Sequence, residues 1–422
     1  MNLAEMRDMV GSIVDYDPNV QTYRDEVNRI LNELYLDFFT DRPWKFAQET
    51  EEVQVYKDVT VTDGVINLNQ NTITSASNPF LDWMEGAIVE IKDADAANNG
   101  EYVIAKSTTG TLYLEGFSST ENNPNVTAVI KQRFIDMPED CSEVLSIGIR
   151  SPTAGTQAHF DYLSRARDEE YSLLLSSTGL PTDWLIYDDV TMTQPVLEPT
   201  LAADPAGTTW SAVGTYYVHY TFVHKNKESA PSPVASAASP TSGNWRLDLS
   251  NLQNTGTNSG IKKRFYLKTT TNSAFYQVSN PDLVETTLSI NDLDLSADHL
   301  VNGRRLPEND GHYKRVRLYP RQDDDYLVEV RFVYRPDRLI EDTDVPEFPP
   351  AHHRYLVYRA CQELFVKHDN LQHSELYRRK ADTELLRIEN TYLSEGAGVW
   401  IKQGYRESQV RYTTQTSLTH RG

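Results

Sequence analysis

The two ends of this chain carry helical patterns, whereas almost everything between them is patterned as β-strand. Residues 19–39 place apolar side chains at three- and four-residue steps, and so do residues 355–365 and 374–393 near the other end. Amphipathic helices so far apart in sequence can bury their apolar stripes only against each other or against the segments between them. We therefore predict one small helical core that is interrupted by inserted β modules.

The residues that start and end the first helix, together with its apolar stripe, define this core. Asp17 is the predicted N-cap, Pro18 fits the first helical turn, and the helix should end before Pro43. The residues that we expect to be buried where the terminal helices meet are Val27, Ile30, Leu34, Phe38, Leu356, Ala360, Leu364, Tyr377 and Leu385.

Two blocks between the helical ends have the two-residue period of strands. Residues 49–133 hold short alternating runs separated by turn signals such as Asn99-Gly100, which favours a small barrel or sandwich. Residues 195–302 hold a second set of runs with Pro- and Ser-rich turns, which favours a β-sandwich. We expect the aromatic strand at 216–222 to lie in the core of that sandwich.

Two shorter segments lie between the blocks and the C-terminal helices. Residues 160–175 read as a short helix. The alternating runs at 315–319 and 326–334 flank the acidic turn Asp323-Asp324-Asp325 and are predicted to form a hairpin. This turn lacks the glycine and the distal glutamate of a calcium loop, so we interpret it as a solvated turn.

These patterns predict an α+β multidomain chain in which a small helical-bundle core with a β-hairpin is interrupted by a small β-barrel or sandwich and by a larger β-sandwich. The expected domains, in chain order, are core residues 1–48, the small barrel at 49–133, core residues 134–194, the β-sandwich at 195–308, core residues 309–396 and a tail at 397–422.

Charge and cysteine content exclude several classes of protein. With 61 acidic and 40 basic side chains the net charge is −21, which makes general nucleic-acid binding a poor hypothesis. One interpretation of this net charge is that it keeps the protein soluble. The other is that it belongs to a surface that lies near DNA without binding it. Cys141 and Cys361 lack metal-site or redox spacing and are expected to be free thiols of a protein made in a reducing cytosol. No signal peptide or membrane span is expected.

The sequence offers no catalytic constellation. It has no Walker loop, no GxGxxG and no GxSxG, and we expect no catalytic residues, no cofactor and no enzyme activity. His352 and His353 could suggest a metal site, but adjacent helical residues point about 100° apart and cannot easily share an ion. We expect no metal here, and we expect this pair to face a neighbouring subunit.

The last residues, 397–422, differ from the rest of the chain because basic and aromatic side chains alternate there against a single acid, Glu407. Trp, Tyr and Arg are the side chains that dominate protein interfaces, so this tail is predicted to be a docking arm. A mobile terminus and a DNA-binding arm are the alternatives. The candidate interface residues are Trp400, Lys402, Tyr405, Arg406, Arg411 and Tyr412.

Without the two β blocks, the remainder resembles the phage head-to-tail adaptor family, also called connector, neck or tail tubular protein A. Four stretches carry the resemblance: the aromatic-Pro-Trp run at 38–44, the segment at 137–147 followed by Tyr162-Leu163-Ser164 and Gly179-Leu-Pro181, the predicted hairpin at 318–336 and the segment at 349–393. The block at 195–302 separately resembles a fibronectin type III or immunoglobulin-like module.

The resemblance implies a homo-oligomeric ring, usually dodecameric, in the virion neck, assembled in the cytoplasm of the bacterial host. Its partners would be the portal protein, a downstream tail or nozzle protein and tail fibres, and double-stranded DNA would pass through the hole. Much of the acidity would then line the channel and repel phosphates. The C-terminal segment of the family commonly reaches the portal, which agrees with a docking arm at 397–422.

Two other functions remain open at this point. The β inserts could recognise host-surface glycans or another tail protein, and this could be combined with an adaptor role. A secreted adhesin or glycosidase with a fibronectin-like accessory domain is a third hypothesis, against which the missing signal peptide and the free cysteines count.

Overall fold

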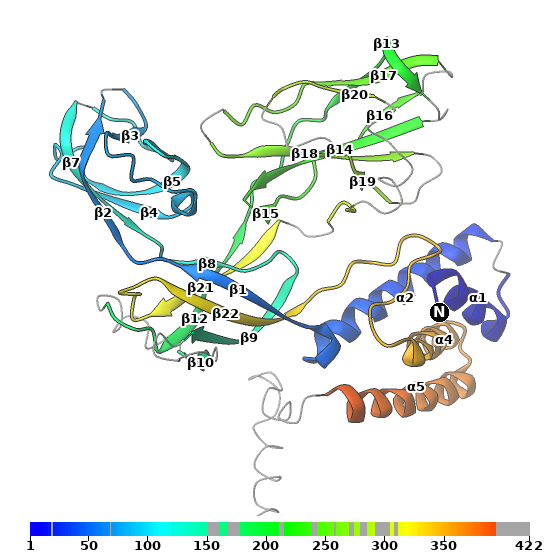
Figure 1. Cartoon of the computed structure of the whole chain (residues 1–422). Coiled ribbons are helices and arrows are strands. Elements are labelled where there is room, and N and C mark those ends of the chain that lie inside the picture. Colours follow the sequence, from blue (N-terminus) through cyan, green and yellow to red (C-terminus); the bar gives the residue numbers. More distant parts are fainter. Residues whose placement is uncertain are drawn as a thin grey trace, which may run out of the picture. The chain divides into compact units, whose positions relative to one another are not determined.

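The structure of the 422-residue chain is a computed structural model (Figure 1). It describes residues 1–17, 20–67, 69–120, 122–150, 160–166, 178–210, 215–225, 227–238, 243–256, 259–269, 274–278, 285–291, 304–307 and 311–393.

The predicted fold class is wrong, because β-structure dominates. Strands account for 41% of the chain and helices for 24%, with four α-helices in the described ranges and several sheets, one of them a six-stranded barrel. The terminal helices do not form a helical-bundle core, since strand and loop residues such as Val333, Leu339 and Phe348 complete their apolar cluster.

The chain divides into two compact units. The first, here called the helical unit, comprises Met1–Thr50, Ser142–Leu145 and Arg331–Gly422. The second, here called the β unit, comprises Glu51–Cys141 and Ser146–Val330.

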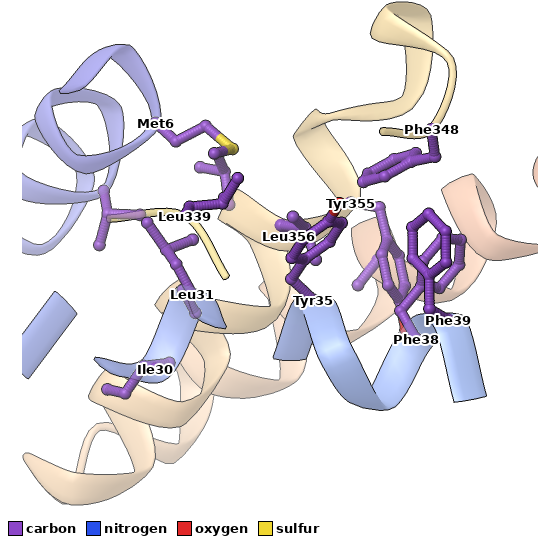
Figure 2. Close-up of a cluster of buried hydrophobic side chains, with 14 of the residues drawn as sticks. Met6, Ile30, Leu31, Tyr35, Phe38, Phe39, Leu339, Phe348, Tyr355 and Leu356 are labelled. Atoms are coloured by element: carbon purple, nitrogen blue, oxygen red, sulfur yellow. The ribbon is translucent and has the colours of Figure 1, made fainter. Parts of the chain in front are cut away.

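The helical unit contains α1 (Leu3–Val14), α2 (Gln21–Asp41), α4 (Arg354–Lys367) and α5 (Leu371–Tyr392), with short 3-10 turns at η1 (Lys45–Ala47) and η5 (Pro350–His352). One hydrophobic cluster gathers side chains from all four α-helices (Figure 2). The structure thus confirms that the two ends of the chain share one core.

The start of the helical unit differs from the prediction in two ways. Helix α1 was not predicted, although Asn2 and Glu5 form a capping box at its first turn. Helix α2 begins at Gln21 with Val20 at its N-cap position, so the predicted N-cap at Asp17 is wrong. The carbonyl of Val20 accepts the N–H of Tyr23 and of Arg24, which starts the helix without a side-chain cap.

A closed barrel forms the first part of the β unit. Its strands are β2 (Val59–Ile66), β3 (Thr72–Ser75), β4 (Ile88–Lys92), β5 (Gly100–Thr108), β6 (Thr111–Leu114) and β7 (Asn123–Lys131), in the order β2-β3-β6-β5-β4-β7, with η2 (Asp82–Met84) between β3 and β4. The inward side chains, among them Val61, Ile104 and Ile130, form a core of their own. Closure leaves no unpaired edge strand.

Two four-stranded sheets follow. One has the order β1-β22-β9-β10 and consists of β1 (Gln48–Val55), β22 (Tyr326–Tyr334), β9 (Cys141–Arg150) and β10 (Phe160–Tyr162). The other has the order β11-β12-β21-β8 and consists of β11 (Ser164–Arg165), β12 (Asp183–Thr191), β21 (His312–Tyr319) and β8 (Ile135–Asp136).

Two predictions fail in these sheets. Strands β21 and β22 belong to different sheets, so the predicted hairpin at 315–334 is wrong. The turn between them is held by other segments instead: Arg321 donates to Asp58 at 2.8 Å, and the backbone N–H of Lys57 donates to Asp325 at 3.0 Å. The predicted helix at 160–175 is also wrong where it is described, since residues 160–166 hold β10 and β11; its remainder lies outside the described residues.

The last part of the β unit has two sheets around one core. The first consists of β13 (Thr200–Trp210), β17 (Gly243–Ser250) and β20 (Leu288–Asn291). The second consists of β15 (Lys227–Glu228), β14 (Thr215–His224), β18 (Lys262–Thr269) and β19 (Tyr276–Gln277), and β16 (Ala235–Ala238) also pairs with β14. Tyr216, Val218, Tyr220 and Phe222 of β14 are buried in the shared core. Its assignment to the immunoglobulin or fibronectin type III type stays a prediction.

Candidate assembly surfaces

Helix α4 lies at the centre of the helical unit and positions the rest of it. Within the described chain it packs against α1, α2 and α5. The predicted core residues Val27, Ile30, Phe38, Leu356, Ala360 and Leu364 are buried in the hydrophobic cluster, and Leu34, Tyr377 and Leu385 are partly buried against it.

An aromatic group closes this core at the C-terminal end of α2 (Figure 2). The ring of Phe38 lies 4.9 Å from that of Trp44 and 5.0 Å from that of Phe348, measured between centroids. The indole N–H of Trp44 donates to the carbonyl of Phe38 at 2.6 Å. The bulky rings and the satisfied indole fix this end of the helix, because aromatic side chains bury large areas with few rotatable bonds.

Sequence reasoning did not find Phe348 and Leu339, which the cluster buries. Both lie in a loop without periodicity, between β22 and α4. The available signal was the position of a single aromatic residue between Pro346 and Pro349, which is too general to predict burial.

The aromatic group also fixes the point where the C-terminal tail leaves the helical unit. Tyr392 at the end of α5 packs edge-on against Phe46, with centroids 5.5 Å apart. Leu393 forms a β-bridge with Trp44, and Arg42 forms an ion pair with Glu389. The tail residues Trp400, Lys402, Tyr405, Arg406, Arg411 and Tyr412 lie outside the described residues.

The two adjacent histidines before α4 differ in their exposure. His353 is fully buried, and its ring contacts the carbonyls of Phe348 at 2.8 Å and Met1 at 3.0 Å. Burial lowers the pKa of His353 below its ordinary value. His352 is 14% exposed and contacts the carboxylate of Glu384 at 2.6 Å. The expectation that this pair faces a neighbouring subunit is therefore wrong for His353 and stays a prediction for His352.

Other chemistry is sparse in the described part of the chain. It contains no group of three or more His, Cys, Asp or Glu side chains that could hold a metal ion. Cys141 and Cys361 are buried and not joined to each other, and burial raises the pKa of the Cys361 thiol to about 12, which makes it a poor nucleophile. No helix among the described residues is long and apolar enough to cross a membrane.

Neighbouring side chains contact the carboxylates of the acidic turn at 323–325. Asp324 pairs with the ammonium of Lys57 at 3.0 Å, and Asp323 accepts the hydroxyl of Tyr326 at 2.7 Å. Lys57 lowers the pKa of Asp324 by hydrogen bonding to its carboxylate. These contacts hold the turn in place, so its side chains are engaged within the protein.

Comparison with protein-family models gives a match near the C-terminal end of the chain. Residues 266–400 match the family model described as SU10 adaptor protein. No curated protein and no solved structure matches the chain. The matched range contains two of the stretches that carry the resemblance, at 318–336 and 349–393, whereas those at 38–44 and 137–147 lie outside it.

The match supports a phage adaptor role in general terms, and with it a structural component of the virion that contacts other phage structural proteins. Its boundaries enclose α4, α5 and the first residues after α5. The matched range also encloses β21 and β22.

Proposed function

We propose that the chain is a structural head-to-tail adaptor of a tailed bacteriophage and not an enzyme. In this proposal it forms a dodecameric ring between the portal and the downstream tail or nozzle protein, in the neck of the virion, and DNA passes through the ring. The match of residues 266–400 to an adaptor family carries the proposal.

The geometry of the helical unit supports a docking role for the tail. Trp44, Phe46 and Arg42 anchor the end of α5, so the residues after Leu393 start from a fixed point on the core. A docking segment that starts from a rigid base loses less conformational entropy on binding than one attached to a flexible arm. We propose that the tail docks on the portal protein.

Deleting residues 397–422 tests this role. The buried residues of the helical core that the structure describes end at Ile388, so the truncated chain should keep its helical circular dichroism. We expect it to lose co-purification with the portal protein of the same phage. A full-length variant in which Trp400, Tyr405 and Tyr412 are all changed to Ser keeps the charge of the tail and should lose most of the binding too. Full portal binding by the truncated chain would exclude the docking arm.

A role as a DNA channel would explain the net negative charge of the chain. With a net charge of −21 per copy, a ring that exposes part of this charge to its lumen repels phosphates and lets the duplex slide. Reversing lumen carboxylates to Lys, once the ring orientation is known, should slow genome ejection. Unchanged ejection kinetics in such variants would contradict the acidic-channel proposal.

A further inference from the structure

The order in which the terminal helices pack leaves two different helix faces exposed. Helix α4 lies between α2 and α5 in the helical unit (Figure 1). It is the described element that contacts α5 most extensively. The face of α5 opposite α4 is therefore a different surface from the outer face formed by α2 and α4.

The outer face of α5 carries leucines and guanidinium groups at helical spacing. This stripe, here called the α5 stripe, consists of Leu376, Arg379, Thr383, Leu386 and Arg387, which recur at three- and four-residue steps. Leu376 is 47% exposed and Leu386 57% exposed. A partner that covered these two leucines would remove their apolar surface from water.

The charges along the α5 stripe are positive at its surface. The side chains of Arg379 and Arg387 are 73% and 68% exposed. Their partners on the same helix, Glu375 and Glu384, are less exposed, at 42% and 12%. The stripe itself contains no acid, but both of its guanidinium groups are ion-paired with carboxylates of the same helix, so it presents exposed guanidinium groups and leucines with Glu375 at its margin.

The exposed α2–α4 face is acidic. Glu33 and Asp37 of α2 and Glu363 of α4 are exposed there, with Arg29 bonded to Glu33 at 2.7 Å. Partial burial and the neighbouring Glu33 carboxylate raise the pKa of Glu363 above its ordinary value. Arg29 and Arg359 offset part of this charge, and the three carboxylates leave the face with a small negative surplus.

We propose that the α5 stripe of one copy docks on the α2–α4 face of the next copy. This inference rests on the proposed ring and specifies the contact between its subunits. Two different, complementary faces of one unit make a head-to-tail contact, which is the type that generates a closed ring when the rotation between copies closes. The leucines supply the buried apolar area, and the paired charges fix the register and select the partner.

A second copy fits this stripe better than the other candidates. DNA would use the guanidinium groups but not the exposed leucines, and a chain with a net charge of −21 repels it. The acidic face has the matching sign and belongs to every copy of the chain. A contact between the stripe and the portal is the remaining alternative, which the experiment below separates.

A charge exchange between two variants tests the contact. In variant A, Arg379→Glu and Arg387→Glu reverse the α5 stripe; in variant B, Glu33→Lys and Glu363→Lys reverse the α2–α4 face. Every substituted side chain is exposed, so both variants should keep the circular dichroism and thermal midpoint of the wild type. Each variant alone brings like charges together at every contact, and we expect neither to form rings on the portal.

An equimolar mixture of A and B should restore rings, since each A–B contact then pairs opposite charges in either order. Rings are counted by negative-stain imaging of the portal-bound fraction, with the wild type as reference. Rings formed by A or by B alone, or no restoration in the mixture, would overturn the inference. A contact between the stripe and the portal would show as loss of portal binding by A that B does not rescue, and this outcome also overturns it.

Cross-linking of the unmodified protein gives a measurement that does not depend on variants. In portal-bound assemblies made from isotopically labelled and unlabelled copies, a carbodiimide should join Lys380, beside the stripe, to Glu33 or Glu363 of a different copy. Absence of this mixed-isotope link in intact rings would contradict the proposed contact. The wider adaptor function fails separately, if the wild-type chain does not bind the portal at all.

Discussion

Single residues of α4 contribute to stability according to their burial, even where they are close neighbours in sequence. Leu364 is fully buried in the core of the helical unit, whereas Val366, two positions further on, is half exposed. Deleting buried methyl groups loses their transfer free energy and leaves a cavity, whereas the same change at the surface leaves water in place of the side chain.

Leu364→Ala should therefore destabilise the helical unit by about 2–5 kcal/mol. Val366→Ala on the same helix should stay within about 0.5 kcal/mol of the wild type. The measurement is the free energy of unfolding in urea, followed by helical circular dichroism. Equal losses for the two variants would mean that α4 is not packed as described.

The exposed carboxylate of Glu375 provides a second prediction at this scale. Hydrogen bonds from Arg378 and then Arg379 lower the pKa of Glu375 from 4.5 to about 2. Because the folded-state value is depressed, the stabilisation is present above the ordinary value and is lost as the pH falls through about 2. An NMR titration of the Glu375 side chain should give a midpoint near 2. In the double variant Arg378→Gln and Arg379→Gln the midpoint should return toward 4.5, and a wild-type midpoint already there would contradict the pairing.

Among the structural elements, the barrel of β2 to β7 has its own core and no open edge. A segment with these properties should fold without the rest of the chain. We predict that the isolated segment 49–133 gives dispersed amide signals in NMR and a single cooperative unfolding transition. A disordered spectrum would show that the barrel depends on its neighbours and is not an inserted domain.

Substitution of Gly64 in β2 tests whether the isolated segment adopts the same barrel as the full-length chain. A Cβ there would lie 2.9 Å from Cγ2 and 3.0 Å from the carbonyl oxygen of Val126 in β7. Gly64→Val should destabilise the segment by about 1–3 kcal/mol through overpacking. Thr60→Ala at an exposed position of the same strand should change the free energy of unfolding by less than about 0.5 kcal/mol.

Helices whose apolar pattern extends over several turns were predictable from the sequence. Elements whose position depends on tertiary contacts were not. The stripes at 19–39 and 374–393 extend over several turns, so spacing alone predicted that one face of each helix packs on the core, although Val20 and Tyr23 at the start of the first stripe are 38% exposed. The Asn99-Gly100 signal marked the β4–β5 hairpin, but the connection there spans residues 93–99 and Gly100 already pairs with Ile91.

The failures have identifiable physical causes. The alternation in β21 and β22 predicts strands but not their partners, and Arg321 and Asp325 tie the intervening turn to 57–58. Helix α1 was missed because its stripe is short, and its packing depends on contacts such as that of Arg7 with Asp342, far along the chain. The helical-bundle fold class failed for the same reason, since loop residues complete the core.

The net charge of −21 acts at the scale of the whole molecule and predicts how the protein treats DNA. Affinity for phosphates comes from counterion release by clustered Lys and Arg, and lowering the salt lengthens the range of repulsion between like charges. The full-length chain should therefore not bind a fluorescent 20–30 bp duplex (about two to three helical turns) in anisotropy titrations, even at low ionic strength. A synthetic peptide of residues 397–422, which has four Lys and Arg and one Glu, should bind the same duplex weakly under these conditions. If the full-length chain bound as well as the peptide, the tail would act as a DNA-binding arm, and its proposed role at the portal would be wrong.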